Sequence, residues 1–139
     1  MSYPISVLPD AELAIIQYLR AHSEVTDLVP AARITTTLPP KAVFPAVTVK
    51  RIGGTALHWA RVDEAAVQVD VWHDYAKRGE CQDIARAVRA TVLAIYGDKV
   101  DEANLVSASE EVGPQWLPDS VTVPPLSRFV ARFQVRLHS

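Results

Sequence analysis

A strand followed at once by a long amphipathic helix, over residues 65–96, constrains this chain most. Over 65–72, apolar residues alternate with Gln68 and Asp70, and a period of two is typical of a strand with one buried face. Apolar side chains then recur at steps of three and four, which places them on one stripe of a helix: Cys81, Ile84, Ala85, Val88, Val92 and Ile95. A strand that feeds a helix across a short polar corner indicates a two-layer α/β sandwich.

Two helices are predicted, each with an aspartate as its N-cap. Asp10 begins a helix that ends near His22, and Ser23 caps one further short turn. Asp74 begins the long helix, which runs to Tyr96 and stops at Gly97.

Four further stretches favour extended structure: 33–38, 46–52, a weaker one at 104–112, and 128–137. Gly53-Gly54 is expected to end the second of these. Residues 55–64 then form a hairpin arm or a long loop, and the prolines of 113–125 mark an irregular loop. The resulting prediction is one α+β domain over 1–139, with a mainly antiparallel sheet of four to five strands and two helices packed on one face.

Composition excludes several classes of protein. The net charge is −2 and no basic run occurs, so a specific nucleic-acid role is disfavoured. The single cysteine, Cys81, leaves no intrachain disulfide and suits synthesis in a reducing cytoplasm. We expect no signal peptide, no membrane span and no membrane partner.

No residue set indicates catalysis, a cofactor or a metal site. Cys81 lies on the apolar stripe of a helix, where a free cysteine is usually a small buried hydrophobe. The four histidines are scattered without ligand spacing. Asp63, Glu64 and Asp70 are explained more simply by a solvated face or by cross-strand charge pairs than by acid–base chemistry. The protein is therefore predicted not to be an enzyme.

The candidate functional residues are those suited to an interface. Arg128, Arg132 and Arg136 stand in a row on the face of the last strand opposite its apolar residues. This row is either a polar outer face or a charged face that meets another subunit or lines a pore. Loop aromatics are the second candidates, because exposed aromatic residues are enriched at interface hot spots. They are Trp59, with Arg61 beside it, and Trp116; Trp72 is expected to pack within the fold.

Four stretches together resemble the tail terminator (tail completion, minor tail) proteins of long-tailed bacteriophages. They are 16–20 (IQYLR), 33–39 (RITTTLP), 44–54 (FPAVTVKRIGG) and 67–72 (VQVDVW) with the helix that follows. The resemblance spans nearly the whole chain.

The resemblance implies a structural virion protein. It would form a ring, usually a hexamer, at the head-proximal end of the tail, where it caps the tail tube, ends tube polymerisation and joins the tail to the head connector. Its implied partners are copies of itself, the tail tube protein and the head–tail connector protein. The loops 55–64 and 113–125 are the candidates for contacts between subunits or with the tube. Two alternatives stay open: another neck, head-closure or tail-tube protein of the same virion, or a small-molecule-binding α+β domain with Asp70, Trp72 and His73 lining its pocket.

Overall fold

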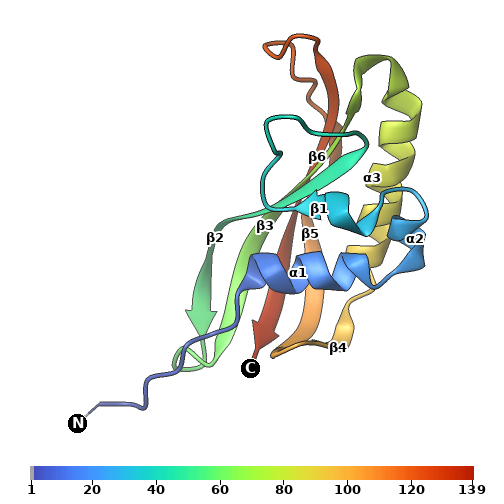
Figure 1. The fold of residues 1–139 in the computed structure, drawn as a ribbon. Coiled ribbons are helices and arrows are strands. Elements are labelled where there is room, and N and C mark those ends of the chain that lie inside the picture. Colours follow the sequence, from blue (N-terminus) through green and yellow to red (C-terminus); the bar gives the residue numbers. More distant parts are fainter. Residues whose placement is uncertain (1) are drawn as a thin grey trace.

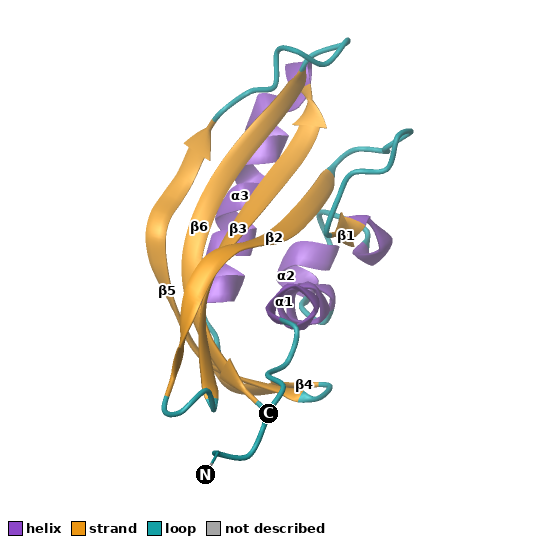
Figure 2. Cartoon of the chain, turned by 90° about the vertical axis from the view of Figure 1, so that its left-hand side faces the viewer, coloured by secondary structure: helices purple, strands orange, loops and turns teal. Residues whose placement is uncertain are grey.

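A computed structural model describes residues 2–139 and has two layers, a curled sheet and a layer of helices on one of its faces (Figures 1 and 2). Six strands lie in the order β1-β2-β3-β6-β5-β4. Their bounds are β1 Ile34–Thr35, β2 Ala46–Leu57, β3 Val62–Asp74, β4 Tyr96–Val100, β5 Ala103–Trp116 and β6 Leu126–His138. All neighbours are antiparallel except β1 and β2. The predicted α+β class and the single helical layer are confirmed, but the sheet has six strands rather than four to five.

The first helix forms as its sequence predicts. α1 (Ala11–Arg20) begins at Asp10, whose carboxylate accepts a hydrogen bond from the backbone N of Leu13 at 3.1 Å. The helix buries Ile15, Ile16 and Leu19 against the sheet. It ends two residues before His22, and α2 (Ser23–Thr26) follows with His22, not Ser23, in the capping position.

The second long helix, α3 (Arg78–Leu93), begins later and ends earlier than predicted. A 3₁₀ turn over Tyr75–Lys77 fills the corner, and the Asp74 side chain makes no capping hydrogen bond. The chain leaves the helix after Leu93, and β4 begins at Tyr96, whose backbone N donates a hydrogen bond to the carboxylate of Asp98. Gly97 therefore lies within a strand that the periodicity did not reveal.

The hairpin of β2 and β3 is longer than predicted, since the two glycines bend the strand without ending it. The register between β2 and β3 shifts between Arg51 and Gly53, and pairing then continues to Leu57 opposite Val62. Gly54 has φ +124°, and a Cβ there would lie 2.2 Å from the carbonyl oxygen of Glu64. Only glycine lets the two backbones approach so closely. Of the two readings of 55–64, the hairpin arm is correct.

β5 also continues further than predicted, through Gly113 and Pro114 to Trp116. β4 pairs with β5 only as far as Ser107, so the proline lies where β5 is an edge of the sheet and needs no donor on its free side. The irregular loop is accordingly 117–125, and Asp119 and Leu126 close it with two backbone hydrogen bonds.

The core lies between the sheet and the helices. On β6 the buried face consists of Phe129, Ala131, Phe133, Val135 and Leu137, and on β3 it includes Val67, Val69 and Val71. These are the residues that the alternation assigned to the apolar face. The opposite face of the sheet is therefore free for polar side chains.

Candidate assembly surfaces

The predicted arginine row lies on the uncovered face of the sheet, and each of its arginines faces a residue of β3. The register sets Arg136 opposite Glu64 and Arg132 opposite Gln68. Nε of Arg136 donates to Glu64 Oε2 at 2.9 Å, and Nε of Arg132 donates to Gln68 Oε1 at 3.2 Å. Both arginines are exposed. Of the pair, Arg136 has a carboxylate partner and Arg132 has a neutral one.

Arg128 is held more tightly at the other end of the row. Its guanidinium carbon lies 5.2 Å from the centre of the Trp72 ring, and its Nε donates to the carbonyl oxygen of Leu117 at 3.0 Å. Its Nη1 lies 3.8 Å from an oxygen of Asp70. Burial raises the pKa of Asp70 even though Gln68 hydrogen-bonds its carboxylate. The uncovered face thus carries mixed charge, with cations in excess at Arg132.

The turn between β2 and β3 carries Trp59 at one end of the molecule. His58, Trp59 and Ala60 all have positive φ, between 52° and 62°, which is a strained region for residues with a Cβ. Trp59 is 74% exposed. The sharp turn therefore projects the Trp59 indole into solvent, and its role in an interface stays a prediction.

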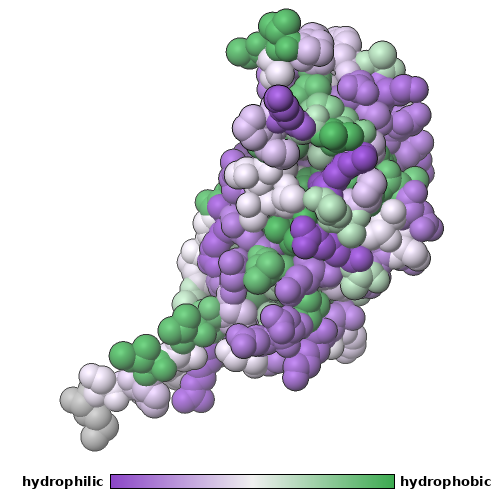
Figure 3. Space-filling view, viewed as in Figure 1, coloured by the Kyte–Doolittle hydropathy of each residue, from purple (hydrophilic) through white to green (hydrophobic). Residues whose placement is uncertain are grey.

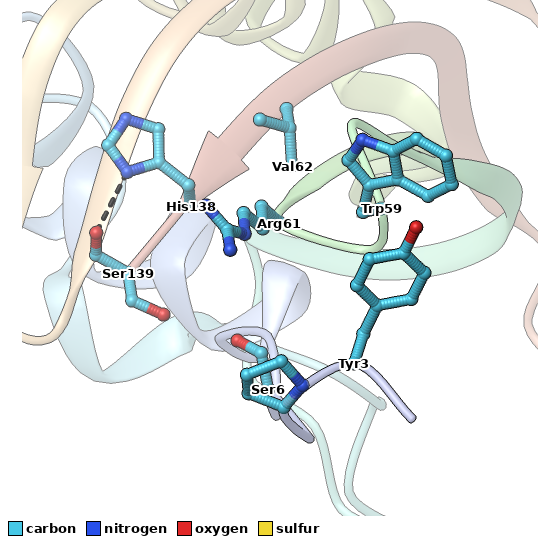
Figure 4. Close-up of a pocket in the computed structure, with 8 residues that line it drawn as sticks. Tyr3, Ser6, Trp59, Arg61, Val62, His138 and Ser139 are labelled. Carbon is cyan, nitrogen blue, oxygen red and sulfur yellow. Dashed lines mark hydrogen bonds between the residues drawn. The ribbon is translucent and has the colours of Figure 1, made fainter. Parts of the chain in front are cut away.

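The N-terminal arm, residues 2–9, passes this turn. The rings of Tyr3 and Trp59 are 4.9 Å apart. Between the arm and the strand ends lies an open hollow of about 360 Å³, whose lining includes Arg61 and His138 (Figure 4). Arg61, the other predicted interface residue of this hairpin, thus faces the same end of the molecule as Trp59.

Exposed apolar side chains gather at both ends of the molecule (Figure 3). At the end with the arm, Ile5 is 95% and Val7 is 86% exposed; in the loop 117–125 at the other end, Val121 is 90% and Val123 is 93% exposed. The sequence prediction placed Val121 and Val123 in a candidate contact loop, 113–125, but did not name the arm. A signal was present, because 2–9 contains no charged residue although the chain has thirty, 14 basic and 16 acidic.

Trp116 lies on β5 rather than on a loop. Its ring is half-buried on the helix side of the sheet, opposite Phe129 in the register, with the guanidinium carbon of Arg78 4.3 Å from the ring centre. Its Nε1 is buried without a hydrogen-bond partner among the described residues. Much of the ring already packs within the fold, and its interface role stays a prediction.

The proposed lining of a small-molecule pocket is wrong for a geometric reason. Asp70 and Trp72 point to the uncovered face, whereas His73, one residue on, is buried on the helix side. There His73 Nδ1 accepts from the backbone N of Asp74, and Nε2 lies 2.9 Å from Glu80. Cys81 is fully buried, and burial raises the pKa of its thiol to about 11.

Within 2–139, no group of three His, Cys, Asp or Glu side chains is placed to hold a metal ion. No helix of that part of the chain is both long and apolar enough to cross a membrane.

Comparison with known proteins gives two findings. Residues 13–136 match the family model described as "Tail completion protein gp17". The fold is similar to that of a chain from the structure "Virion of native gene transfer agent (GTA) particle", with a TM-score of 0.69 and 17% sequence identity over 93% of this chain and 95% of that chain. No curated protein matches.

The family match makes this chain a structural protein of bacteriophage-type tails. More specifically, it belongs to the tail completion protein gp17 family, so the resemblance found in the sequence is confirmed.

Proposed function

We propose that the protein forms a ring, a hexamer in the virion, that caps the tail tube at its head-proximal end. The ring ends tube polymerisation and presents its other surface to the head connector. The observation that carries the proposal is the family match over 13–136. Its fold similarity to a chain of a gene transfer agent virion agrees with a place in a multi-protein particle.

The shape of the molecule supports this role. A closed ring of head-to-tail contacts needs two different patches on each subunit, not one self-complementary patch. The chain offers two different ends, one with Trp59 and the arm, the other with Val121 and Val123. Single exposed apolar residues are common, but groups at both ends of a small domain are typical of contact surfaces.

Light scattering tests the ring. We expect the purified protein to associate at high concentration, or on mixing with tail tube subunits, into a species of about six chains that negative-stain images show as a ring. Mobile ends can delay association in the free protein. A protein that stays monomeric under both conditions would contradict the proposal.

A second measurement separates this role from that of a tube subunit. A cap limits the length of tubes assembled in its presence, whereas a tube subunit is incorporated along them. We expect shorter tubes as the ratio of this protein to tube protein rises, with the protein labelled only at tube ends. Labelling along the tube would favour the alternative.

A further inference from the structure

The arm has the pattern of a strand but no sheet. Tyr3, Ile5 and Val7 alternate with Pro4, Ser6 and Leu8. Of these, Tyr3 is 66%, Ile5 is 95% and Val7 is 86% exposed. No residue from 2 to 9 is charged. None of these residues lies in a β-ladder within the described chain. An uncharged, alternating segment left in water is typical of a strand that completes another sheet.

The same end of the molecule carries an open sheet edge. On the side of β2 away from β3, β1 pairs only with Val47 and Thr48. Further along that edge, the backbone N of Arg51 donates a hydrogen bond to Oε2 of Glu12, a residue of α1, at 2.7 Å. Beyond it, over 53–57, no strand among the described residues covers the edge, and this stretch (GGTAL) is also uncharged. Exposed edges are usually protected by charge or proline, so an uncharged one invites pairing.

The positions of the two prolines in the arm are compatible with such pairing. In an extended segment, alternate residues direct their N–H and C=O groups to the same side. If Tyr3, Ile5 and Val7 face the edge of β2, then Pro4 lies on the outer side, where a missing N–H costs nothing. Pro9, on the inner phase, ends the ladder just before α1. Pro4 would also keep a further strand from adding to the arm.

We propose that the arm of one copy adds as a strand to residues 53–57 of β2 in a second copy of this chain. The proposal rests on the ring of the proposed function and supplies one of its subunit contacts. Residues 2–7, when extended, reach about 20 Å, and the five-residue edge is about 17 Å long. Exchange of an identical segment between protomers is a low-cost route to association.

A second copy fits better than the arm's own edge. Within one chain the arm already passes the tip of the β2–β3 hairpin, where Tyr3 contacts Trp59. Even so, Ile5 and Val7 keep nearly all of their surface in solvent, and no ladder forms. Within a single subunit, therefore, neither the apolar arm nor the edge over 53–57 has a strand partner among the described residues, although Gly53 O accepts a hydrogen bond from Arg51 Nε at 3.0 Å.

A matched pair of proline variants tests which arm residues direct their backbone N–H groups toward the edge of β2. Val7→Pro removes a donor on the bonding side, whereas Ser6→Pro removes one on the free side. We expect Val7→Pro to weaken association by about tenfold per contact and Ser6→Pro to leave it within about twofold. Equal effects of the two variants would overturn the proposed ladder.

Disulfide trapping tests the pairing directly. Ile5→Cys and Thr55→Cys are made in separate chains with tags of different size, so that a 5–55 disulfide can form only between copies. The native Cys81 is fully buried and stays in both. The control pairs Ile5→Cys with Gln115→Cys on β5, the opposite edge of the sheet. We expect a heterodimer from the first mixture under mild oxidation and little from the control.

The outcomes separate the two proposals. Rings without the 5–55 disulfide would overturn the arm exchange and leave the ring standing. Monomers without the disulfide would overturn both. A double variant that forms the disulfide within one monomer, while the mixed chains do not, would show that the arm closes on its own edge and would also overturn the exchange.

Discussion

Arg136 Nε donates to Glu64 Oε2 at 2.9 Å, although the two residues are 72 positions apart in the chain. They face each other across β6 and β3 on the uncovered side of the sheet. The contact therefore accords with the placement of the arginine row on the uncovered face of β6. Exposed pairs of this kind contribute about 0–1 kcal/mol, so the row matters more for what it presents than for stability.

Arg132 is the arginine of the row best placed to meet a partner, since it is exposed and its side chain's only hydrogen bond within residues 2–139 is to neutral Gln68. We expect Arg132→Glu to change the free energy of unfolding by less than about 0.5 kcal/mol but to impair assembly, because charge complementarity selects partners. Urea unfolding and light scattering measure the two effects. Arg86→Glu, on the exposed side of α3, is the matched control. Loss of folding, or normal assembly, would count against a contact role for Arg132.

Asp70 gives a prediction about pH. Burial raises its pKa, so the folded protein holds this proton more tightly than the unfolded chain. Between the ordinary and the raised pKa, the free energy of unfolding falls as pH rises, and the penalty persists at neutral pH. Asp70→Asn should therefore be more stable than the wild type at pH 7, with a gain that fades as pH drops below the ordinary Asp range.

Chemical unfolding at a series of pH values checks the Asp70 prediction. Asp83→Asn is the control, because the Asp83 side chain is 67% exposed on α3. A destabilised Asp70→Asn at pH 7 would mean that the attraction of Arg128 outweighs the cost of burial.

Local sequence patterns correctly predicted which faces of the main strands are buried and where the first helix begins. Alternation gave the buried faces of β3 and β6, and the Asp10 cap gave the start of α1. These features depend on neighbours within a few residues, which a sequence displays directly. The row of arginines follows from the same periodicity.

Where long-range pairing decides the structure, the sequence misled. Gly53-Gly54 and Pro114 normally end strands, yet here β3 and β6 go on pairing with their neighbours past them, with a shift of register at each place. β4 is defined by its pairing with β5, from Tyr96 opposite Ser107 to Val100 opposite Ala103, which periodicity does not display. The missing Asp74 cap is a local error, because a 3₁₀ turn over Tyr75–Lys77 separates Asp74 from the start of α3. Which surfaces stay uncovered likewise depends on the whole fold, so the exposed arm with Ile5 was missed.

Gly54 is the backbone position least able to change. A Cβ there would lie 2.2 Å from Glu64 O at a φ of +124°, so Gly54→Ala should destabilise the fold by about 2–3 kcal/mol. Gly79→Ala is the control, since it lies in α3 with open space around its Cβ position and should gain up to about 1 kcal/mol. Thermal unfolding of both variants measures the difference. A harmless Gly54→Ala would show that the two strands can separate at the bulge.

Trp116 distinguishes packing from partner contact. Removing the ring in Trp116→Ala should cost about 3 kcal/mol, because it packs against the core with Arg78 over its face. Trp116→Phe keeps a ring and removes the unpartnered Nε1, so its stability should stay within about 1 kcal/mol of the wild type. Assembly of Trp116→Phe is then informative: normal assembly would indicate that Trp116 serves the fold alone.

Trp59 offers the reverse case, a residue whose loss should help the monomer. Its φ of 59° is costly for a side chain with a Cβ, and 74% of its surface is exposed. Trp59→Gly should therefore stabilise the free subunit by up to about 1 kcal/mol, whereas Trp59→Ala keeps the backbone strain and serves as the control. Both variants remove the indole and should weaken assembly alike in light scattering. Strain retained at an exposed aromatic residue is expected when the side chain is needed by a partner. If both variants assembled normally, the partner contact would have to lie elsewhere on this end of the molecule.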